Sequence, residues 1–212
     1  MDTTDLSPKH IAIAGNIGAG KTTLTGLLAK HLNWTPFYED VDDNPYLYDF
    51  YKDMTRWSFN LQIYFLNKRL QQLVEIKQLG TTVVQDRTIY EDARIFAPNL
   101  NAMGLMSNRD YDNYQQLFTT VQSLIQPPDL IVYLRASIPT LVHHIQHRGR
   151  QFEDSLRLDY LRRLNDVYED WIKNHTESKV LIINIDDLDF ENSNEALSEI
   201  IQRVQSNLYG LF

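Results

Sequence analysis

The sequence has no cysteine, and its 212 residues include only eight glycines and seven prolines. The lack of cysteine excludes disulfides and thiolate metal sites, and it is compatible with a reducing compartment. No segment is long and apolar enough to cross a bilayer, and the polar stretch 1–8 lacks the apolar core of a signal peptide. We therefore expect a cytoplasmic protein without membrane association.

Positive charge is also scarce: the sequence has 20 Lys and Arg residues against 28 Asp and Glu residues, which gives a formal net charge of -8. A long nucleic acid needs a broad basic face, so we expect no nucleic-acid polymer as a partner. Small anionic ligands need only a few local cations and remain compatible with this balance. The length and the 43% hydrophobic content fit one globular unit, and we expect a single domain over residues 1–212.

Short apolar runs alternate with longer amphipathic stretches along the chain. The runs predict strands over 10–14, 34–38, 81–85, 130–134 and 180–185. Helices are predicted up to residue 32, over 56–79, up to 125 with a break near 98–104, over 138–147, from 157, and over 195–208. The first half of the helix over 56–79 is apolar nearly all round, so we expect it to be buried on several sides. This alternation predicts an α/β fold, with a five-stranded parallel sheet flanked by helices on both faces.

One motif carries specific chemistry. The stretch 15–22 fits the G-x-x-x-x-G-K-[ST] pattern between a predicted strand and a predicted helix, and it consists of Gly15, Asn16, Ile17, Gly18, Ala19, Gly20, Lys21 and Thr22. Glycines let successive backbone N–H groups turn toward phosphate oxygens, and the helix N-terminus adds positive potential. Lys21 supplies a cation for the outer phosphates and Thr22 a ligand for magnesium. The motif predicts binding of a nucleoside triphosphate together with Mg²⁺.

Three further features lie where a phosphate acceptor would meet this loop. Glu39 follows the second strand and could accept a proton, although it also belongs to an acidic run that solvent alone would explain. Asp86 and Arg87 follow the third strand and could hold magnesium and phosphate, or form a structural ion pair. Arg148 and Arg150, with Glu153, occupy a polar loop and could close over the phosphates, or form a basic helix end.

Ordered motifs then extend over nearly the whole chain: GNIGAGKT, the Glu39 region, DDNPYL (42–47), RWSFNLQ (56–62), DRTIYED (86–92), RGR (148–150) with Glu153, and IDDLDF (185–190). In these motifs the chain resembles the deoxynucleoside kinase family, and most of all its bacterial deoxyadenosine and deoxyguanosine kinase branch. The resemblance implies a P-loop kinase fold with a lid at about 148–156. It also implies phosphoryl transfer from ATP to the 5′-hydroxyl of a deoxynucleoside.

The same resemblance implies roles for individual residues. Glu39 would take the proton of the 5′-hydroxyl beside Arg87, and Asp86 would join Thr22 in the magnesium shell. Tyr51 and Glu153 would hold the sugar 3′-hydroxyl, and Gln62, Arg69, Asp92 and Phe96 would bind the base. Arg148 and Arg150 would clamp the donor phosphates. Taken alone, Gln62, Arg69 and Phe96 would each be better explained as a core amide, a surface charge and a core ring, and only the joint pattern favours a base-binding site.

The charged pair of Arg69 and Asp92 accompanies purine and cytosine substrates in this family. The resemblance therefore implies deoxyadenosine or deoxyguanosine as the best acceptor, deoxycytidine as a further one, and thymidine as a poor one. Family members are commonly homodimers, and we expect one here. Three positions depart from the family pattern: Asp40 stands in place of a proline, Asp86 in place of a glutamate, and His144 in place of an arginine.

Two other readings stay open. A thymidylate-type kinase would share the P-loop and the Asp-Arg pair but would also bind the monophosphate of its substrate. A non-catalytic nucleotide-binding module would bind a triphosphate without turnover.

Overall fold

The computed structural model describes residues 7–39, 41, 43–150, 153 and 156–210. Its strands form a five-stranded, wholly parallel sheet in the order β2-β3-β1-β4-β5. The strands are β1 (His10–Gly15), β2 (Thr35–Phe37), β3 (Val83–Asp86), β4 (Leu130–Arg135) and β5 (Lys179–Asn184). The predicted parallel sheet is confirmed, with each strand shifted by at most two residues at either end.

Helices connect the strands. They are α1 (Lys21–Leu32), α2 (Leu47–Lys52), α3 (Met54–Leu79), α4 (Ile89–Glu91), the π-helical turn η1 (Asp92–Phe96), α5 (Ala97–Ala102), α6 (Asn108–Gln122), α7 (Ile138–Arg148), α8 (Leu158–Asn174) and α9 (Asn194–Tyr209). None of the described helices is both long and apolar enough to span a membrane.

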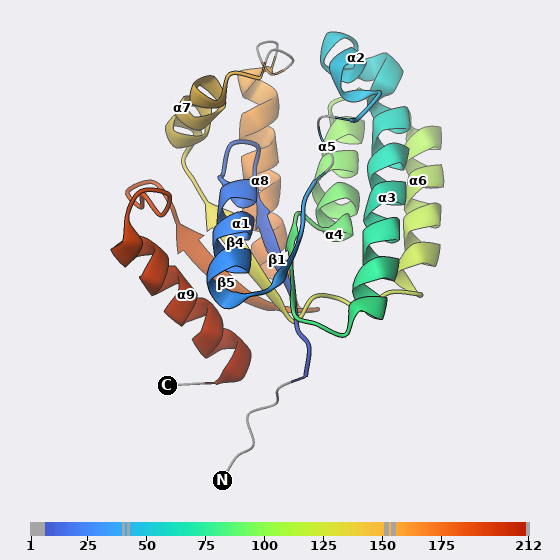
Figure 1. Ribbon diagram of the computed structural model, residues 1–212. Coiled ribbons are helices and arrows are strands. Elements are labelled where there is room, and N and C mark those ends of the chain that lie inside the picture. The colour runs from blue at the N-terminus through green and yellow to red at the C-terminus, as the bar shows by residue number, and fades with distance from the viewer. Residues whose placement is uncertain (1–6, 40, 42, 151–152, 154–155, 211–212) are drawn as a thin grey trace.

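Helices cover both faces of the sheet, as predicted. On one face, Ile11 and Ile13 of β1 pack in a cluster with residues of α1 and α9. On the other face, Ala12 and Ala14 pack with residues of α2, α3 and α8. Figure 1 shows α1 and α9 on one side of the sheet, and α3 and α6 side by side on the other. This alternation along a single strand explains why β1 is apolar throughout: both of its faces are buried.

Two expectations about helices were wrong in detail. Pro98 lies within the first turn of α5, where its missing N–H costs nothing, so the break comes instead at Met103–Ser107. Arg148 is the last residue of α7 rather than part of a loop. The expectation that α3 is buried on several sides is confirmed for its first half. Its buried residues form one stripe at helical spacing (Met54, Ser58, Leu61, Gln62, Leu66 and Arg69), and Trp57 and Phe65 pack in one hydrophobic cluster while Phe59 and Ile63 pack in another.

The polar residues that follow the strands meet at one edge of the sheet. The register places Ile13 of β1 beside Asp86 of β3, and Phe37 of β2 beside Gln85. The chain segments that leave β1, β2 and β3 therefore emerge together, and in Figure 1 they lie below α2 and the end of α7. The carboxyl edge of a parallel sheet is where such folds bind their ligands.

Candidate active site

The P-loop joins β1 to α1. Gly18 and Gly20 have φ angles of 85° and 81°, which side chains disfavour, and a Cβ on Gly18 would lie 2.7 Å from the carbonyl oxygen of Leu141 in α7. His144, also in α7, donates from Nδ1 to the carbonyl oxygen of Gly18 at 2.9 Å. Helix α7 therefore packs directly on the loop, and glycine is required at the contact.

The first residues of the loop are anchored to the protein. The backbone N–H of Gly15 donates to Glu91 Oε1 at 3.3 Å. The side-chain amide of Asn16 donates to the carbonyl oxygen of Leu161 and to Asn165 Oδ1, both in α8. Lys21 donates from Nζ to the carbonyl oxygen of Asn16 at 3.0 Å. Burial, reinforced by Arg87, lowers the pKa of Lys21 to about 8.

Thr22 and Asp86 come together as predicted. The Thr22 hydroxyl donates to Asp86 Oδ2 at 2.5 Å, while Asp86 Oδ1 is buried and has no hydrogen-bond partner among the described residues. Within the same residues there is no cluster of three or more His, Asp or Glu side chains that could hold a metal ion. A hydroxyl beside a carboxylate with one unpartnered oxygen suits Mg²⁺, which commonly binds one or two protein oxygens and completes its ligand shell with phosphate and water oxygens.

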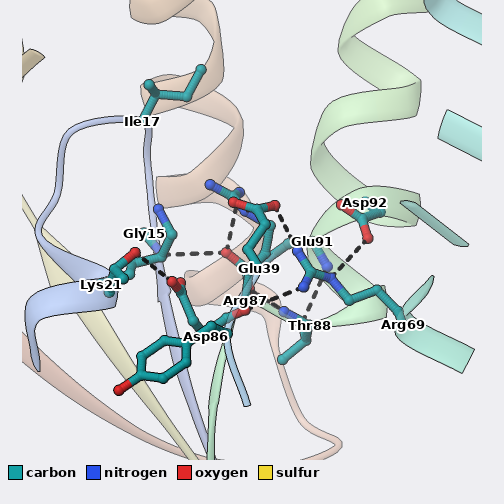
Figure 2. A network of polar contacts seen from close by, with 12 residues as sticks. Gly15, Ile17, Lys21, Glu39, Arg69, Asp86, Arg87, Thr88, Glu91 and Asp92 are labelled. Atoms are coloured by element: carbon teal, nitrogen blue, oxygen red, sulfur yellow. Dashed lines mark hydrogen bonds and ion pairs between the residues drawn. The ribbon is translucent and has the colours of Figure 1, made fainter. Parts of the chain in front are cut away.

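Glu39 lies between two guanidinium groups, as Figure 2 shows. Its Oε1 accepts from Arg69 Nη2 at 2.6 Å and lies 3.2 Å from Arg87 Nε. Burial alone would raise the pKa of Glu39, but the charges of Arg87, Arg69 and Lys21 outweigh it and lower the pKa to about 2. The Glu39 carboxylate is thus ionised and oriented by the two arginines, and the alternative of a solvated acid is wrong for Glu39.

Asp92 sits on the other side of Arg69, with Asp92 Oδ2 3.4 Å from Arg69 Nε. Here burial dominates, and it raises the pKa of Asp92 to about 7 despite the nearby arginines. Asp92 and Phe96 begin and end the π-helical turn η1, a distortion that often marks functional sites because it redirects side chains. Both residues line the cleft described next.

A cleft of about 890 Å³ opens above these groups. A volume of this size suits small-molecule ligands. The predicted site residues that line it are Ile17, Gly18, Gly20, Lys21, Thr22, Glu39, Tyr51, Gln62, Arg87, Asp92, Phe96, Arg148, Arg150 and Glu153. One end of the cleft therefore carries the P-loop, and the other carries the groups predicted to bind an acceptor.

Two features of the acceptor end favour a polar ligand. Gln62 is 2% exposed, and its Oε1 has no hydrogen-bond partner in the described part of the chain. Burial raises the pKa of the Tyr51 phenol above its usual range, which keeps the phenol neutral and able to donate. Buried polar atoms without partners are costly, so a ligand that satisfies Gln62 would gain binding energy.

The predicted lid is only partly described, because residues 151–152 and 154–155 of the expected 148–156 lie outside the described residues. Arg148 Nη2 contacts both carboxylate oxygens of Glu153, at 2.5 and 2.6 Å, and Arg150 Nη1 lies 4.0 Å from Glu153 Oε1. Glu153 is thus paired with the two arginines predicted to clamp phosphate. Asp40, one of the departures from the family pattern, also lies outside the described residues.

The family model that matches this chain covers residues 11–209 and describes deoxynucleoside kinases. The chain belongs to the deoxynucleoside kinase family. The match takes in every strand and the whole of the cleft, and the sheet with its P-loop is the P-loop kinase fold expected from the sequence.

Individual relatives agree. The kinase is 38% identical over 206 residues to a deoxyadenosine/deoxycytidine kinase of Bacillus subtilis, with 95% of each chain covered. It is 45% identical over 168 residues to a deoxyadenosine kinase of Dictyostelium discoideum, covering 79% of this chain and 68% of the relative. A solved deoxyadenosine kinase from M. mycoides with bound dATP superposes with a TM-score of 0.83 at 31% identity, covering 93% of this chain and 100% of the other.

Arg69 is placed differently from the expectation. The resemblance implies that Gln62 and Arg69 both bind the base, yet the lining of the cleft, as far as the chain is described, includes Gln62 without Arg69. Arg69 is 1% exposed and lies behind the wall, where it contacts Glu39, Asp92 and the carbonyl oxygen of Asp86. Two residues seven positions apart on a helix share a face, but the contact with Glu39 turns the Arg69 side chain toward the sheet.

Sequence reasoning also missed residues of the site. His143, His147 and Tyr160 line the cleft, and Glu91 and Tyr168 contact Arg87 from behind it. No local sequence pattern indicates that these histidines and tyrosines belong to the site. Glu91 could have been found, because Thr88-x-x-Glu91 is the signature of a capping box, and the structure contains that box.

Proposed function

We propose that this kinase transfers the γ-phosphoryl group of ATP to the 5′-hydroxyl of a purine deoxynucleoside, with deoxyadenosine as the preferred acceptor. The observation that carries the proposal is the position of Glu39. Its carboxylate lies in the same cleft as the P-loop and is held by Arg69 and Arg87. The names of the B. subtilis, D. discoideum and M. mycoides relatives support adenine as the base.

The donor end supports the following roles. The P-loop N–H groups and Lys21 bind the β- and γ-phosphates, and Arg148 and Arg150 neutralise charge on the transferring group after leaving Glu153. Burial and the charge of Arg87 lower the pKa of Lys21, and the negative charge of a bound phosphate would favour its charged form. Thr22 and Asp86 would hold Mg²⁺, which supplies charge neutralisation between the phosphates.

Glu39 accepts the proton of the 5′-hydroxyl, and Arg87 orients the hydroxyl beside it. A carboxylate with a pKa of about 2 is a weak base. Such a base suffices because phosphoryl transfer through a loose transition state demands little activation of the nucleophile, and the proton leaves late. The main contribution of Glu39 is therefore orientation of the hydroxyl.

The base end supports recognition of an amino-substituted ring. The unpartnered Gln62 Oε1 can accept from the adenine amino group, while the amide of the same side chain donates to a ring nitrogen. Thymine offers a carbonyl where adenine has this amino group. Gln62 can turn its amide to meet either ring, so the discrimination lies with the buried pair of Arg69 and Asp92, which the family resemblance ties to purine and cytosine substrates. A buried polar mismatch of this kind costs about 1–3 kcal/mol per group. Thymidine is therefore the poor substrate of the set.

Magnesium, a homodimeric assembly, a cytoplasmic location and one domain over residues 1–212 complete the proposal, and these rest on the sequence. The two rival functions differ in the product they predict. With ATP and Mg²⁺, we expect deoxyadenosine to become dAMP. Conversion of dTMP to dTDP without any dAMP would favour a thymidylate-type kinase. Binding of ATP without either product would favour a non-catalytic module.

A further inference from the structure

Glu91 is a buried carboxylate that the proposed reaction leaves without a role. It is 0% exposed, and both of its oxygens are used. Oε2 accepts from the backbone N–H of Thr88 at 2.8 Å and from the Thr88 hydroxyl at 3.3 Å. Oε1 accepts from the Tyr168 hydroxyl at 2.8 Å and from the N–H of Gly15 at 3.3 Å. The helix cap needs only Oε2, so the cap does not explain what Oε1 contacts.

Oε1 leads to the reaction site through Tyr168, which belongs to α8. Arg87 donates from Nη1 to the Tyr168 oxygen at 2.7 Å. A guanidinium only donates and a phenol has one proton, so the Tyr168 proton must point to Glu91. The direction of both hydrogen bonds is therefore fixed. The ring itself stacks on Tyr133 with centroids 5.8 Å apart and planes 13° apart, which restricts its rotation.

Arg87 is restrained on every side. Its backbone has a φ of 68°, unusual for a residue other than glycine, and its guanidinium lies 4.5 Å from the centre of the Phe96 ring. One edge of the guanidinium, Nε, meets Glu39 at 3.2 Å, and the other, Nη1, meets Tyr168. Tyr168 and Glu91 thus hold one edge of the Arg87 guanidinium, and the opposite edge contacts Glu39, the proton acceptor of the proposed reaction.

We propose that Glu91 and Tyr168 are positioning residues that fix Arg87 against Glu39 and tie both to the first glycine of the P-loop. The inference rests on the proposed function and adds a residue pair to it. Because Gly15 and Tyr168 share Glu91 Oε1, the phosphate loop and the acceptor arginine have one common anchor. Misplacing a reacting group by about 1 Å can cost about 10²-fold in rate, so such an anchor bears on kcat.

Tyr168→Phe removes the shared hydroxyl, and Tyr133→Phe is its matched control. The two rings stack on each other, but the Tyr133 hydroxyl donates to Glu169, which pairs with Arg135 and lies outside the cleft. We expect Tyr168→Phe to lower kcat for deoxyadenosine by about 10- to 10²-fold, with the KM for ATP changed less than about twofold. Tyr133→Phe should leave both constants near those of the wild type. Melting temperatures of all three proteins accompany the kinetics.

A purely structural pair gives a different pattern. If Tyr168→Phe lowers the melting temperature but keeps the wild-type kcat, the inference is overturned. Should Tyr168→Phe fail to fold, Glu91→Gln replaces it, because the amide oxygen can still cap Thr88 while the negative charge 3.6 Å from Arg87 Nη1 is removed. A wild-type kcat in folded Glu91→Gln would equally overturn the inference. Absence of turnover in the wild type would remove the proposed function itself, and this inference with it.

Discussion

Replacing Glu39 with glutamine changes one atom of the cleft and removes the group on which the proposed chemistry depends. The amide keeps the size of the side chain but cannot accept a proton, and one of its two ends now donates. Because Glu39 Oε1 currently accepts from Arg69 and faces Arg87, the glutamine can satisfy only part of this arrangement. Glu39→Gln therefore affects both the reaction and the fold.

The kinetic effect follows from the role of a positioned base, which typically contributes ~10²–10⁴ in rate, or roughly 3–5 kcal/mol of barrier. The pKa of about 2 makes Glu39 a weak base, so we expect a loss near the lower end, about 10²-fold in kcat. The KM for ATP should stay close to the wild-type value, because the P-loop is untouched.

The stability effect has a defined sign. The folded-state pKa of Glu39 is below its ordinary value of 4.5, so the carboxylate stabilises the fold above pH 4.5, and this stabilisation is lost as pH falls toward 2. The difference corresponds to at most roughly 3 kcal/mol at neutral pH. Glu39→Gln should therefore unfold at lower urea concentration than the wild type at pH 7.

Initial-rate assays of dAMP formation at saturating ATP measure the kinetic part, and Glu169→Gln serves as control because Glu169 is a half-exposed partner of Arg135 outside the cleft. A kcat for Glu39→Gln within about threefold of the wild type, in folded protein, would refute the assignment of Glu39 as the base.

Three further substitutions test separate parts of the site. Burial raises the pKa of Asp92 to about 7, so the fold loses stability as pH rises from about 4 to 7. Asp92→Asn should therefore be more stable than the wild type at pH 8, by at most roughly 4 kcal/mol in urea unfolding. Equal stability of the two proteins at that pH would contradict the burial argument. In Gly18→Ala the new Cβ would lie 2.7 Å from the Leu141 carbonyl oxygen at a φ of 85°, so we expect calorimetric ATP affinity to fall at least about tenfold. Asp86→Asn removes the negative charge beside Thr22, so half-maximal activity should need about tenfold more Mg²⁺, and an unchanged magnesium titration would exclude Asp86 from the metal shell.

The sheet and the P-loop could be predicted because each depends on a local pattern. Five apolar runs produced five strands, and the runs are clearest in β1 and β4 because both faces of these strands are buried. The loop could be predicted for a similar reason: Gly18 and Gly20 adopt backbone angles that other residues avoid, so the motif requires glycine at those positions. The family resemblance added the acceptor residues, most of which line the cleft.

The remaining features depend on contacts between distant parts of the chain. Arg69 lies 30 residues from Glu39 in sequence, and only the contact of α3 with the segment that follows β2 brings their side chains to 2.6 Å. Tyr168 reaches Arg87 across 81 residues, with no motif at either end to announce the contact. The end of α7 was misplaced by one residue because the C-cap is Gly149, which allows Arg148 to complete the last turn.

The central claim is that the acceptor is a purine deoxynucleoside, and kcat/KM for the four deoxynucleosides with ATP and Mg²⁺ tests it most directly. The buried pair of Arg69 and Asp92, which the family resemblance ties to purine and cytosine substrates, predicts the highest value for deoxyadenosine or deoxyguanosine, and for thymidine a value lower by at least about 10²-fold. Comparable kcat/KM for thymidine and deoxyadenosine would contradict the account.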